Sequence, residues 1–187
     1  MVEDRGTMKR AVFFDRDGVL VRSLVRDGKP FAATTLEEFE IVPESGDVAG
    51  RLAEAGFELV VFTNQPDVGN GLMERSVVEE MNRILQQTLP LTGIKVCFHS
   101  QTDGCACRKP KPGMLIEAAR EFDLDLSQSY VVGDRKSDIE AGNAAGCFTI
   151  YIDQGYQEPS PEDADKRVHS LTEARDLILA LEGNGIE

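Results

Sequence analysis

The sequence contains neither a long apolar segment nor an excess of positive charge. No run in its 187 residues approaches the roughly 20 apolar residues that cross a bilayer, so we expect no membrane span. The segment Met1–Arg10 is charged and lacks the apolar core of a signal peptide, so we expect a cytoplasmic protein. Lys and Arg number 20 against 33 Asp and Glu, which gives a net charge of −13 and argues against nucleic acid or anionic lipid as a partner.

The composition is that of an ordinary globular protein. Apolar residues make up 41% and charged residues 28%, which is too apolar for a disordered chain. A length of 187 residues suits a single core. We therefore expect one domain over residues 1–187, with residues 1–8 as a flexible extension, and no feature demands more than a monomer.

Short apolar runs alternate with helical patterns along the whole chain, which predicts an α/β fold with a central parallel sheet of about five strands and helices on both faces. The expected strands are Arg10–Phe14, Phe57–Phe62, Ile94–Phe98, Tyr130–Val132 and Cys147–Ile152. The expected helices are Gly46–Gly56, Glu74–Thr88, Pro112–Phe122, Lys136–Ala145 and Leu171–Leu181.

Two stretches lack clear periodicity. Gly18–Pro43 is long for a loop in a compact domain, and such loops are usually functional. It has room for a small hairpin over the site but not for a large cap domain. The polar stretch Asp153–His169 contains two prolines and is expected to be a surface loop.

Polar residues follow four of the predicted strands. In an open parallel sheet, ligands bind outside the carboxyl ends of the strands, so these residues should meet at one edge. The four segments are Asp15-Arg16-Asp17-Gly18-Val19, Thr63-Asn64-Gln65, Arg108-Lys109-Pro110 and Gly133-Asp134-Arg135-Lys136-Ser137-Asp138.

In their order and structural context, these segments resemble the motifs of the haloacid-dehalogenase-like (HAD) superfamily of phosphohydrolases. The resemblance covers about Arg10 to Ile152 and implies a Rossmann-like three-layer sandwich. It also implies that Asp15 attacks phosphorus as a nucleophile and forms an aspartyl-phosphate. Mg²⁺ would neutralise the approaching anions, with Asp15, the backbone carbonyl of Asp17 and Asp134 as its protein ligands.

The resemblance also assigns roles to the neighbouring residues. Asp17 would protonate the leaving alkoxide and then activate the hydrolytic water. Thr63 would bind phosphoryl oxygens, Lys109 would balance developing charge, and Asn64, Gln65 and Arg108 would contact substrate. Asp138 would support the site by holding a metal-bound water or orienting Lys109; alternatively, it caps the helix that begins nearby.

Four residues near the third expected strand form a second candidate metal site. Cys97 and His99 are followed by Cys105 and Cys107, the first of them six positions after the histidine. Three thiolates and one imidazole suit a closed, structural zinc site. Zinc would pin the loop that carries Arg108 and Lys109. Free cysteines or a redox-active Cys-x-Cys pair are the alternatives. Cys147 lies in an apolar run and is expected in the core.

The zinc ligands and the run CACRKPKPGM resemble the zinc-bearing branch of the superfamily, which contains heptose 1,7-bisphosphate phosphatases and histidinol-phosphate phosphatases. The implied substrate is a small phosphorylated metabolite, preferably D-glycero-D-manno-heptose 1,7-bisphosphate. Histidinol phosphate is the nearest alternative. A non-catalytic, zinc-stabilised binding module is a different class of hypothesis, although the intact pair Asp15 and Asp17 argues against it.

Overall fold

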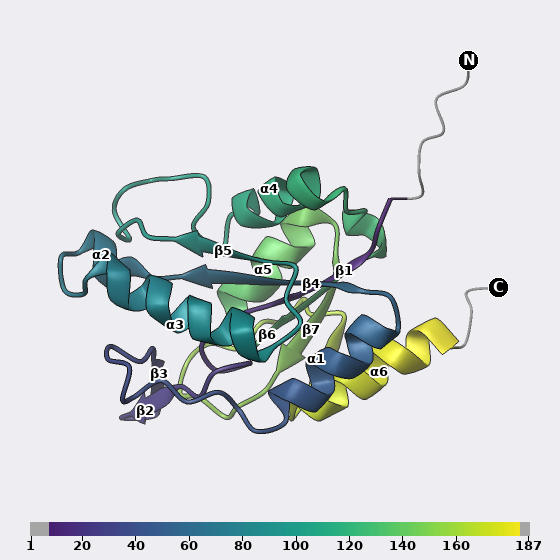
Figure 1. Cartoon of the computed structure of the whole chain (residues 1–187), viewed down its shortest axis with the longest axis horizontal. Helices are drawn as coiled ribbons and strands as arrows, with labels where there is room; N and C mark the ends of the chain where they lie inside the picture. The colour runs from purple at the N-terminus through teal and green to yellow at the C-terminus, as the bar shows by residue number, and fades with distance from the viewer. Residues whose placement is uncertain (1–7, 184–187) are drawn as a thin grey trace, which may run out of the picture.

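The computed structural model describes residues 8–183, which form one six-stranded sheet and a separate two-stranded hairpin (Figure 1). Every pairing in the six-stranded sheet is parallel, and the strand order is β5-β4-β1-β6-β7-β8. The strands are β1 (Ala11–Phe14), β4 (Glu58–Asn64), β5 (Gly93–Cys97), β6 (Tyr130–Gly133), β7 (Phe148–Ile152) and β8 (Lys166–Val168). The expected parallel α/β architecture is confirmed. The expected N-terminal extension lies, except for Met8, outside the described residues.

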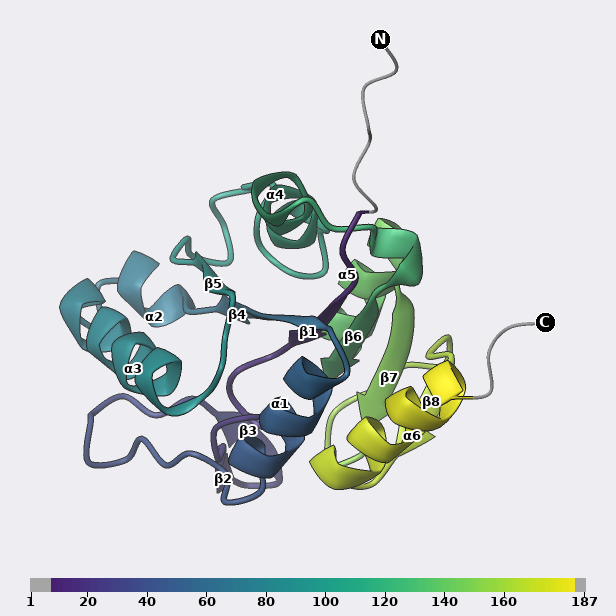
Figure 2. The ribbon, with the colours of Figure 1, turned by 45° about the vertical axis from the view of Figure 1, so that its right-hand side comes forward.

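Helices cover both faces of the sheet, which gives the three layers seen in Figure 2. On one face lie α1 (Ser45–Glu54), α3 (Arg75–Thr88) and α6 (Leu171–Gly183), and on the other lie α4 (Gly113–Phe122) and α5 (Lys136–Ala145). Two short helical turns, α2 (Pro66–Gly69) and η1 (Leu126–Gln128), complete the list. No helix in the described part of the chain is long and apolar enough to cross a membrane.

The central strand β1 supplies side chains to two separate cores. Val12 and Phe14 belong to the cluster under α1 and α6, whereas Ala11 and Phe13 belong to the cluster under α4. All four side chains are almost completely buried. A strand covered on both faces reads as a continuous apolar run, which is why this segment was recognisable in the sequence.

The segment 18–43 contains the antiparallel hairpin of β2 (Leu24–Arg26) and β3 (Lys29–Phe31). Its turn residues, Asp27 and Gly28, both have positive φ, as the mirror-image turns of tight hairpins require. The backbone N–H of Gln157 donates to Gly28 at 2.8 Å and so attaches the hairpin to the loop after β7. As expected, the segment holds no large cap domain.

The stretch 153–169 is not only a surface loop. It contains β8, which pairs in parallel with β7 in the register Ile150↔Lys166, so the sheet has six strands rather than about five. A three-residue strand is too short for alternation to be recognised in the sequence.

Candidate active site and metal centres

The polar segments after the strands meet at one edge of the sheet, as predicted. Phe14 of β1 pairs with Val61 of β4 and Val132 of β6, so the residues that follow these three strands are neighbours. A cavity of about 390 Å³ lies at this edge. Eight of the predicted site residues line it: Asp15, Asp17, Thr63, Asn64, Gln65, Arg108, Lys109 and Asp138.

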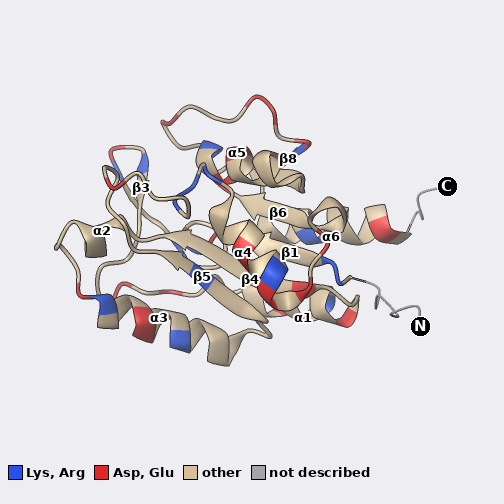
Figure 3. Cartoon of the chain, turned by 90° about the horizontal axis from the view of Figure 1, so that it is seen from above, with Lys and Arg blue, Asp and Glu red and all other residues tan. Residues whose placement is uncertain are grey.

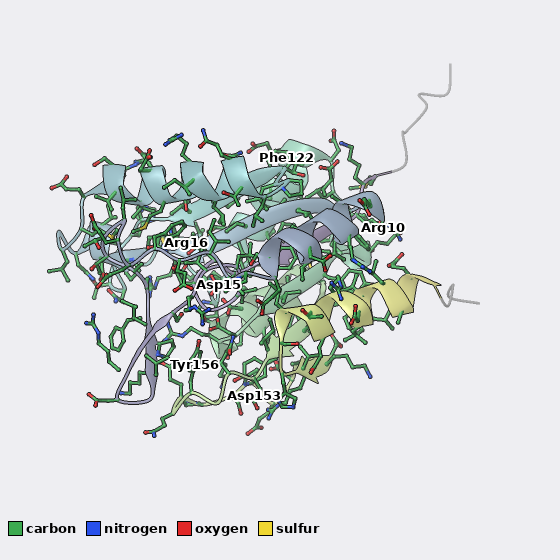
Figure 4. All side chains as sticks on the ribbon, turned by 60° about the horizontal axis from the view of Figure 1, so that its bottom comes forward. Arg10, Asp15, Arg16, Phe122, Asp153 and Tyr156 are labelled. Carbon is green, nitrogen blue, oxygen red and sulfur yellow. The ribbon has the colours of Figure 1, made fainter. Side chains whose placement is uncertain are left out.

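The carboxylate of Asp15 is held at the end of β1 by two donors. Its Oδ1 atom accepts from Lys109 Nζ at 2.8 Å and from the backbone N–H of Arg16 at 2.7 Å. Burial, followed by the charge of Asp138, raises the pKa of Asp15, while Lys109 opposes the rise. Figure 4 shows Asp15 and Arg16 near the centre of the molecule. The arrangement leaves a fixed carboxylate at the base of the cavity.

Lys109 lies between two carboxylates. Its ammonium nitrogen is 2.8 Å from Asp15 and 2.7 Å from Asp138, and it also donates to the backbone oxygen of Phe62 at 3.1 Å. Burial acts to lower the pKa of Lys109, but the charges of Asp138 and Asp15 raise it above its usual value. The lysine is therefore a fixed positive charge in the site.

Asp138 contacts both Lys109 and the start of α5, the two positions that the alternative roles in the sequence analysis require. Its Oδ1 atom pairs with Lys109, and its Oδ2 atom accepts from the backbone N–H of Arg135 at 3.0 Å, at the start of α5. Helix capping and orientation of the lysine are therefore compatible.

Asp134 lacks the partners that a buried carboxylate needs. It is 1% exposed, and the one side-chain donor beside it within residues 8–183, the Tyr156 hydroxyl, does not reach good hydrogen-bond geometry. Burial, followed by the charges of Asp15 and Asp138, raises its pKa well above the usual range. Carboxylate oxygens of Asp15, Asp134 and Asp138 lie within 4.8 Å of one another. Three carboxylates around one lysine leave negative charge unbalanced, so the residues present fit a divalent cation with oxygen ligands.

Gly18 permits the close approach of Asp134. Its φ of +95° lies in the left-handed region, and a Cβ atom there would stand 1.9 Å from Asp134 Oδ2. Both the backbone conformation and the space therefore require glycine at this position.

Asp17 lies on the other side of the cavity and is bound by donors from two segments. Gln65 Nε2 donates to Asp17 Oδ2 at 2.7 Å and to Thr63 Oγ1 at 2.9 Å. Arg16 donates to the same carboxylate through Nε at 3.1 Å and through a terminal nitrogen at 3.2 Å. Gln65 was assigned to substrate, but its amide links two predicted catalytic side chains. Arg16 was not predicted as a site residue, although it stands between the two aspartates of the motif.

Asn64 also has a protein partner. Its side-chain amide accepts from the backbone N–H of Lys109 at 3.1 Å and donates to the Lys109 carbonyl at 3.2 Å. Asn64 therefore fixes the backbone that carries the lysine. Its predicted contact with substrate stays a prediction.

Three further basic side chains, Lys29, Arg108 and Arg135, line the cavity together with the acidic Asp67 and Glu158. Arg108 has a buried terminal nitrogen without a hydrogen-bond partner in the described residues, and a second, adjoining cavity also reaches it. Lys29 of β3 and Arg135 line both cavities, and Figure 3 shows basic residues at β3 and at the start of α5. Arg135 pairs with Glu158 through contacts of 2.7 and 3.0 Å. Sequence reasoning missed Lys29, which has no motif, and Arg135, whose position directly after Asp134 was a usable signal.

The predicted zinc ligands converge in the loop after β5. The sulfur atoms of Cys97, Cys105 and Cys107 lie 3.3 to 3.7 Å apart, and His99 Nδ1 is 3.2 Å from Cys107 and 3.6 Å from Cys97. A tetrahedral zinc ion with sulfur bonds of about 2.3 Å separates its sulfur ligands by about 3.8 Å. Burial and the neighbouring sulfurs raise the pKa of Cys107 to about 12, so a cation is needed to hold it as thiolate. The donor set fits zinc, and the four cysteines are free of disulfides.

Comparison with known proteins agrees with this geometry. A family model described as HAD-hydrolase-like matches residues 106–176. The D-glycero-beta-D-manno-heptose-1,7-bisphosphate 7-phosphatase of Pseudomonas aeruginosa is 36% identical over 149 residues, which cover 77% of this chain and 81% of the relative. The D-glycero-alpha-D-manno-heptose-1,7-bisphosphate 7-phosphatase of Mycobacterium tuberculosis is 34% identical over 163 residues, covering 81% and 84% of the two chains.

A solved structure shows the same fold over almost the whole chain. The D,D-heptose 1,7-bisphosphate phosphatase of Bordetella bronchiseptica, crystallised with magnesium and phosphate, superimposes with a TM-score of 0.77 at 29% identity. The match covers 92% of this chain and 99% of that structure. From its strand-end motifs, its fold and these relatives, the chain belongs to the HAD-like family of hydrolases, among its phosphatases.

Proposed function

We propose that the chain hydrolyses D-glycero-D-manno-heptose 1,7-bisphosphate in the presence of magnesium and removes the phosphate at position 7. The observation that carries this proposal is the pairing of Asp15 with Lys109 beside the buried carboxylate of Asp134, which has no ion pair among the described residues. The substrate and the position come from the names of the relatives, which cover about four fifths of this chain. Arg108, whose buried terminal nitrogen has no hydrogen-bond partner among the described residues, and Lys29 line the cavity and could bind a second phosphate.

The first half of the reaction uses Asp15 and Asp17. A carboxylate oxygen of Asp15 forms a bond to phosphorus, and the bond from phosphorus to the sugar oxygen breaks. Asp17, which lines the same cavity, gives its proton to that oxygen because an alkoxide is a poor leaving group. Thr63 and Lys109 bind and neutralise the phosphoryl group. A sugar and an aspartyl-phosphate result.

The second half returns Asp15 to its starting state. Asp17 removes a proton from a water molecule, which attacks phosphorus and releases Asp15 and inorganic phosphate. Magnesium bound by Asp15, Asp134 and the carbonyl of Asp17 would lower the repulsion between the carboxylate and the phosphate. The ion would also balance the three neighbouring carboxylates.

Zinc has a structural place in this proposal. Four protein ligands leave no open coordination position for substrate. Lys109 follows Cys107 by two residues, so an ion in this site would fix the loop that delivers the lysine to Asp15. Cytoplasmic residence and a monomeric state stay predictions.

Initial rates with heptose 1,7-bisphosphate, heptose monophosphates, other sugar phosphates and histidinol phosphate, each with magnesium and with a chelator, test the proposal. We expect the heptose bisphosphate to give the largest kcat/KM, and only with magnesium. Asp15→Asn should lose about 10⁴-fold or more in rate while keeping its melting temperature. Preferential turnover of histidinol phosphate would overturn the substrate. Folded protein without any phosphatase activity would favour the binding-module alternative.

A further inference from the structure

Arg16 is a completely buried arginine in the loop that carries Asp15 and Asp17. Its exposed fraction is 0%, and its guanidinium group lies 5.8 Å from the ring centre of Phe39. Figure 4 labels it next to Asp15. A guanidinium group cannot lose its charge at ordinary pH, so its burial requires a negatively charged partner and further acceptors.

Asp17 is the only carboxylate paired with Arg16 among the described residues. The guanidinium group approaches both of its oxygens, Oδ2 through Nε at 3.1 Å and Oδ1 through a terminal nitrogen at 3.2 Å. Such a forked contact fixes the rotation of a carboxylate as well as its distance. The side chain of Asp17 is 12% exposed and lines the cavity that also holds Asp15.

Asn82 fixes the far side of the guanidinium group. It lies on α3, is 9% exposed, and accepts through Oδ1 from the remaining terminal nitrogen of Arg16 at 3.0 Å. Helix α3 supplies none of the residues that line the active-site cavity. A polar side chain buried under this helix and aimed at Arg16 therefore acts on the cavity only through Arg16 and Asp17.

We propose that Arg16 and Asn82 are positioning residues that fix the orientation of Asp17, so that its Oδ1 atom, which accepts only one described hydrogen bond, is left to hold the proton that passes to the leaving group. Gln65 completes the set, because its amide donates to Asp17 Oδ2 from the end of the neighbouring strand β4. This inference rests on the proposed function, since it assigns a task to Asp17 in that reaction. In this proposal Asp17 touches the reacting atoms, whereas Arg16 and Asn82 act only through Asp17.

The dependence of the rate on the leaving group distinguishes positioning from a general structural role. A sugar alkoxide needs a proton as it departs, whereas p-nitrophenolate departs without one. Both substrates need Asp15, Lys109 and magnesium. The value of kcat/KM reports the steps up to departure of the leaving group, so the later hydrolysis of the aspartyl-phosphate does not enter.

The experiment compares kcat/KM for the best sugar phosphate and for p-nitrophenyl phosphate in Asn82→Ala, Asn82→Leu and Arg16→Lys. General acid catalysis contributes about 10² to 10⁴-fold, so we expect losses of about tenfold to a hundredfold on the sugar phosphate. On the aryl phosphate we expect changes within about twofold. Gln86→Ala is the matched control, because Gln86 is an exposed amide one turn further along α3. It should leave both rates unchanged.

A double-mutant cycle gives the second readout. In an Asp17→Asn background, Asn82→Ala should cause no further loss on the sugar phosphate, because the group that Asn82 positions is already inactive. Equal losses on both substrates, or a full additional loss in the Asp17→Asn background, would overturn the proposal. Wild-type protein that turns over aryl phosphate but no sugar phosphate would instead refute the proposed substrate class. Melting temperatures identify any variant that does not fold, and the isosteric Asn82→Leu then takes the place of Asn82→Ala.

Discussion

Lys109 Nζ lies 2.8 Å from Asp15 Oδ1, although Asp15 follows the central strand β1 and Lys109 lies in the loop after the edge strand β5. Both side chains are almost fully buried, and the same ammonium group is 2.7 Å from Asp138. The lysine thus separates two carboxylates that would otherwise repel each other. Removing it should affect both the chemistry and the fold.

We expect Lys109→Met to lower kcat/KM by about 10² to 10³-fold, the usual cost of removing one group that stabilises transition-state charge. The uncompensated carboxylates of Asp15 and Asp138 should also lower the melting temperature of the metal-free protein. Steady-state kinetics and thermal unfolding with and without magnesium measure both effects. Lys166→Met, a change at an exposed lysine on β8, is the control. An unchanged rate in Lys109→Met would contradict this role.

Magnesium should stabilise the protein more as pH rises. Burial and neighbouring charges raise the folded-state pKa of Asp134 above the ordinary aspartate value of 3.8. A raised carboxyl pKa contributes stability that is fully present below the unfolded pKa and is lost as pH rises through the folded pKa. Magnesium binds the ionised carboxylate. The gain in melting temperature on adding magnesium should therefore grow as pH rises through the folded-state pKa of Asp134.

Asp134→Asn provides the comparison for this effect, because it keeps the shape of the side chain but cannot ionise. The variant should be more stable than the metal-free parent at neutral pH and should gain little from magnesium. Differential scanning calorimetry between about pH 5 and pH 8 measures this effect, because carboxylates with ordinary pKa values are already ionised in that range. A magnesium effect that is independent of pH, or equal in the two proteins, would count against Asp134 as a ligand.

Zinc should protect three of the four cysteines from thiol reagents. Cys97, Cys105 and Cys107 lie together with His99, whereas Cys147 is buried in the core, and burial raises its pKa to about 12. At about pH 8 Cys147 is therefore a neutral, unreactive thiol. We expect a folded, zinc-loaded protein to react slowly, and a strong chelator to release zinc and expose three thiols. Rapid modification of all four before chelation would argue against the site.

Gly18→Ala tests the contact between the loop after β1 and Asp134. The added methyl group would overlap Asp134 Oδ2, so we expect the carboxylate to move, with a large loss of activity and of magnesium affinity. Gly146→Ala is a matched control, because Gly146 also has a positive φ of +80° but open space around its missing Cβ. Both variants carry the left-handed backbone cost of about 1–2 kcal/mol. Only Gly18→Ala should lose activity at temperatures where both are folded.

The site residues could be predicted because a parallel sheet brings the ends of its strands together. Asp15, Thr63 and Asp134 each follow or end a strand with a clear apolar pattern, so their convergence needs no knowledge of side-chain contacts. The four candidate zinc ligands could be grouped from the sequence for a similar reason, since residues with strong metal preference lie within one short segment. Local sequence patterns were therefore enough to predict at which edge of the sheet the site lies and which residues form the two candidate metal sites.

Long-range polar contacts could not be predicted. The hydrogen bond from Arg16 to Asn82 joins residues 66 positions apart, and although Arg16 lies inside the first motif, no sequence signal links it to Asn82. The same applies to Glu158, which pairs with Arg135 from the loop after β7. Strand β8 was missed because three residues are too few for a period to be measured. In each case tertiary packing, rather than local preference, sets the structure.

The pairing of β1 with β6 also determines how much of the chain the active site needs. Asp15 directly follows β1 and Asp134 directly follows β6, and the two strands pair in the sheet although β4 and β5 lie between them in the chain. A partly folded chain, such as one still emerging from the ribosome, would bring only one of these carboxylates to the site. Because Asp134 and Asp138 both follow β6 in the chain, a chain truncated before β6 would lack two of the three carboxylates that lie close together at the site.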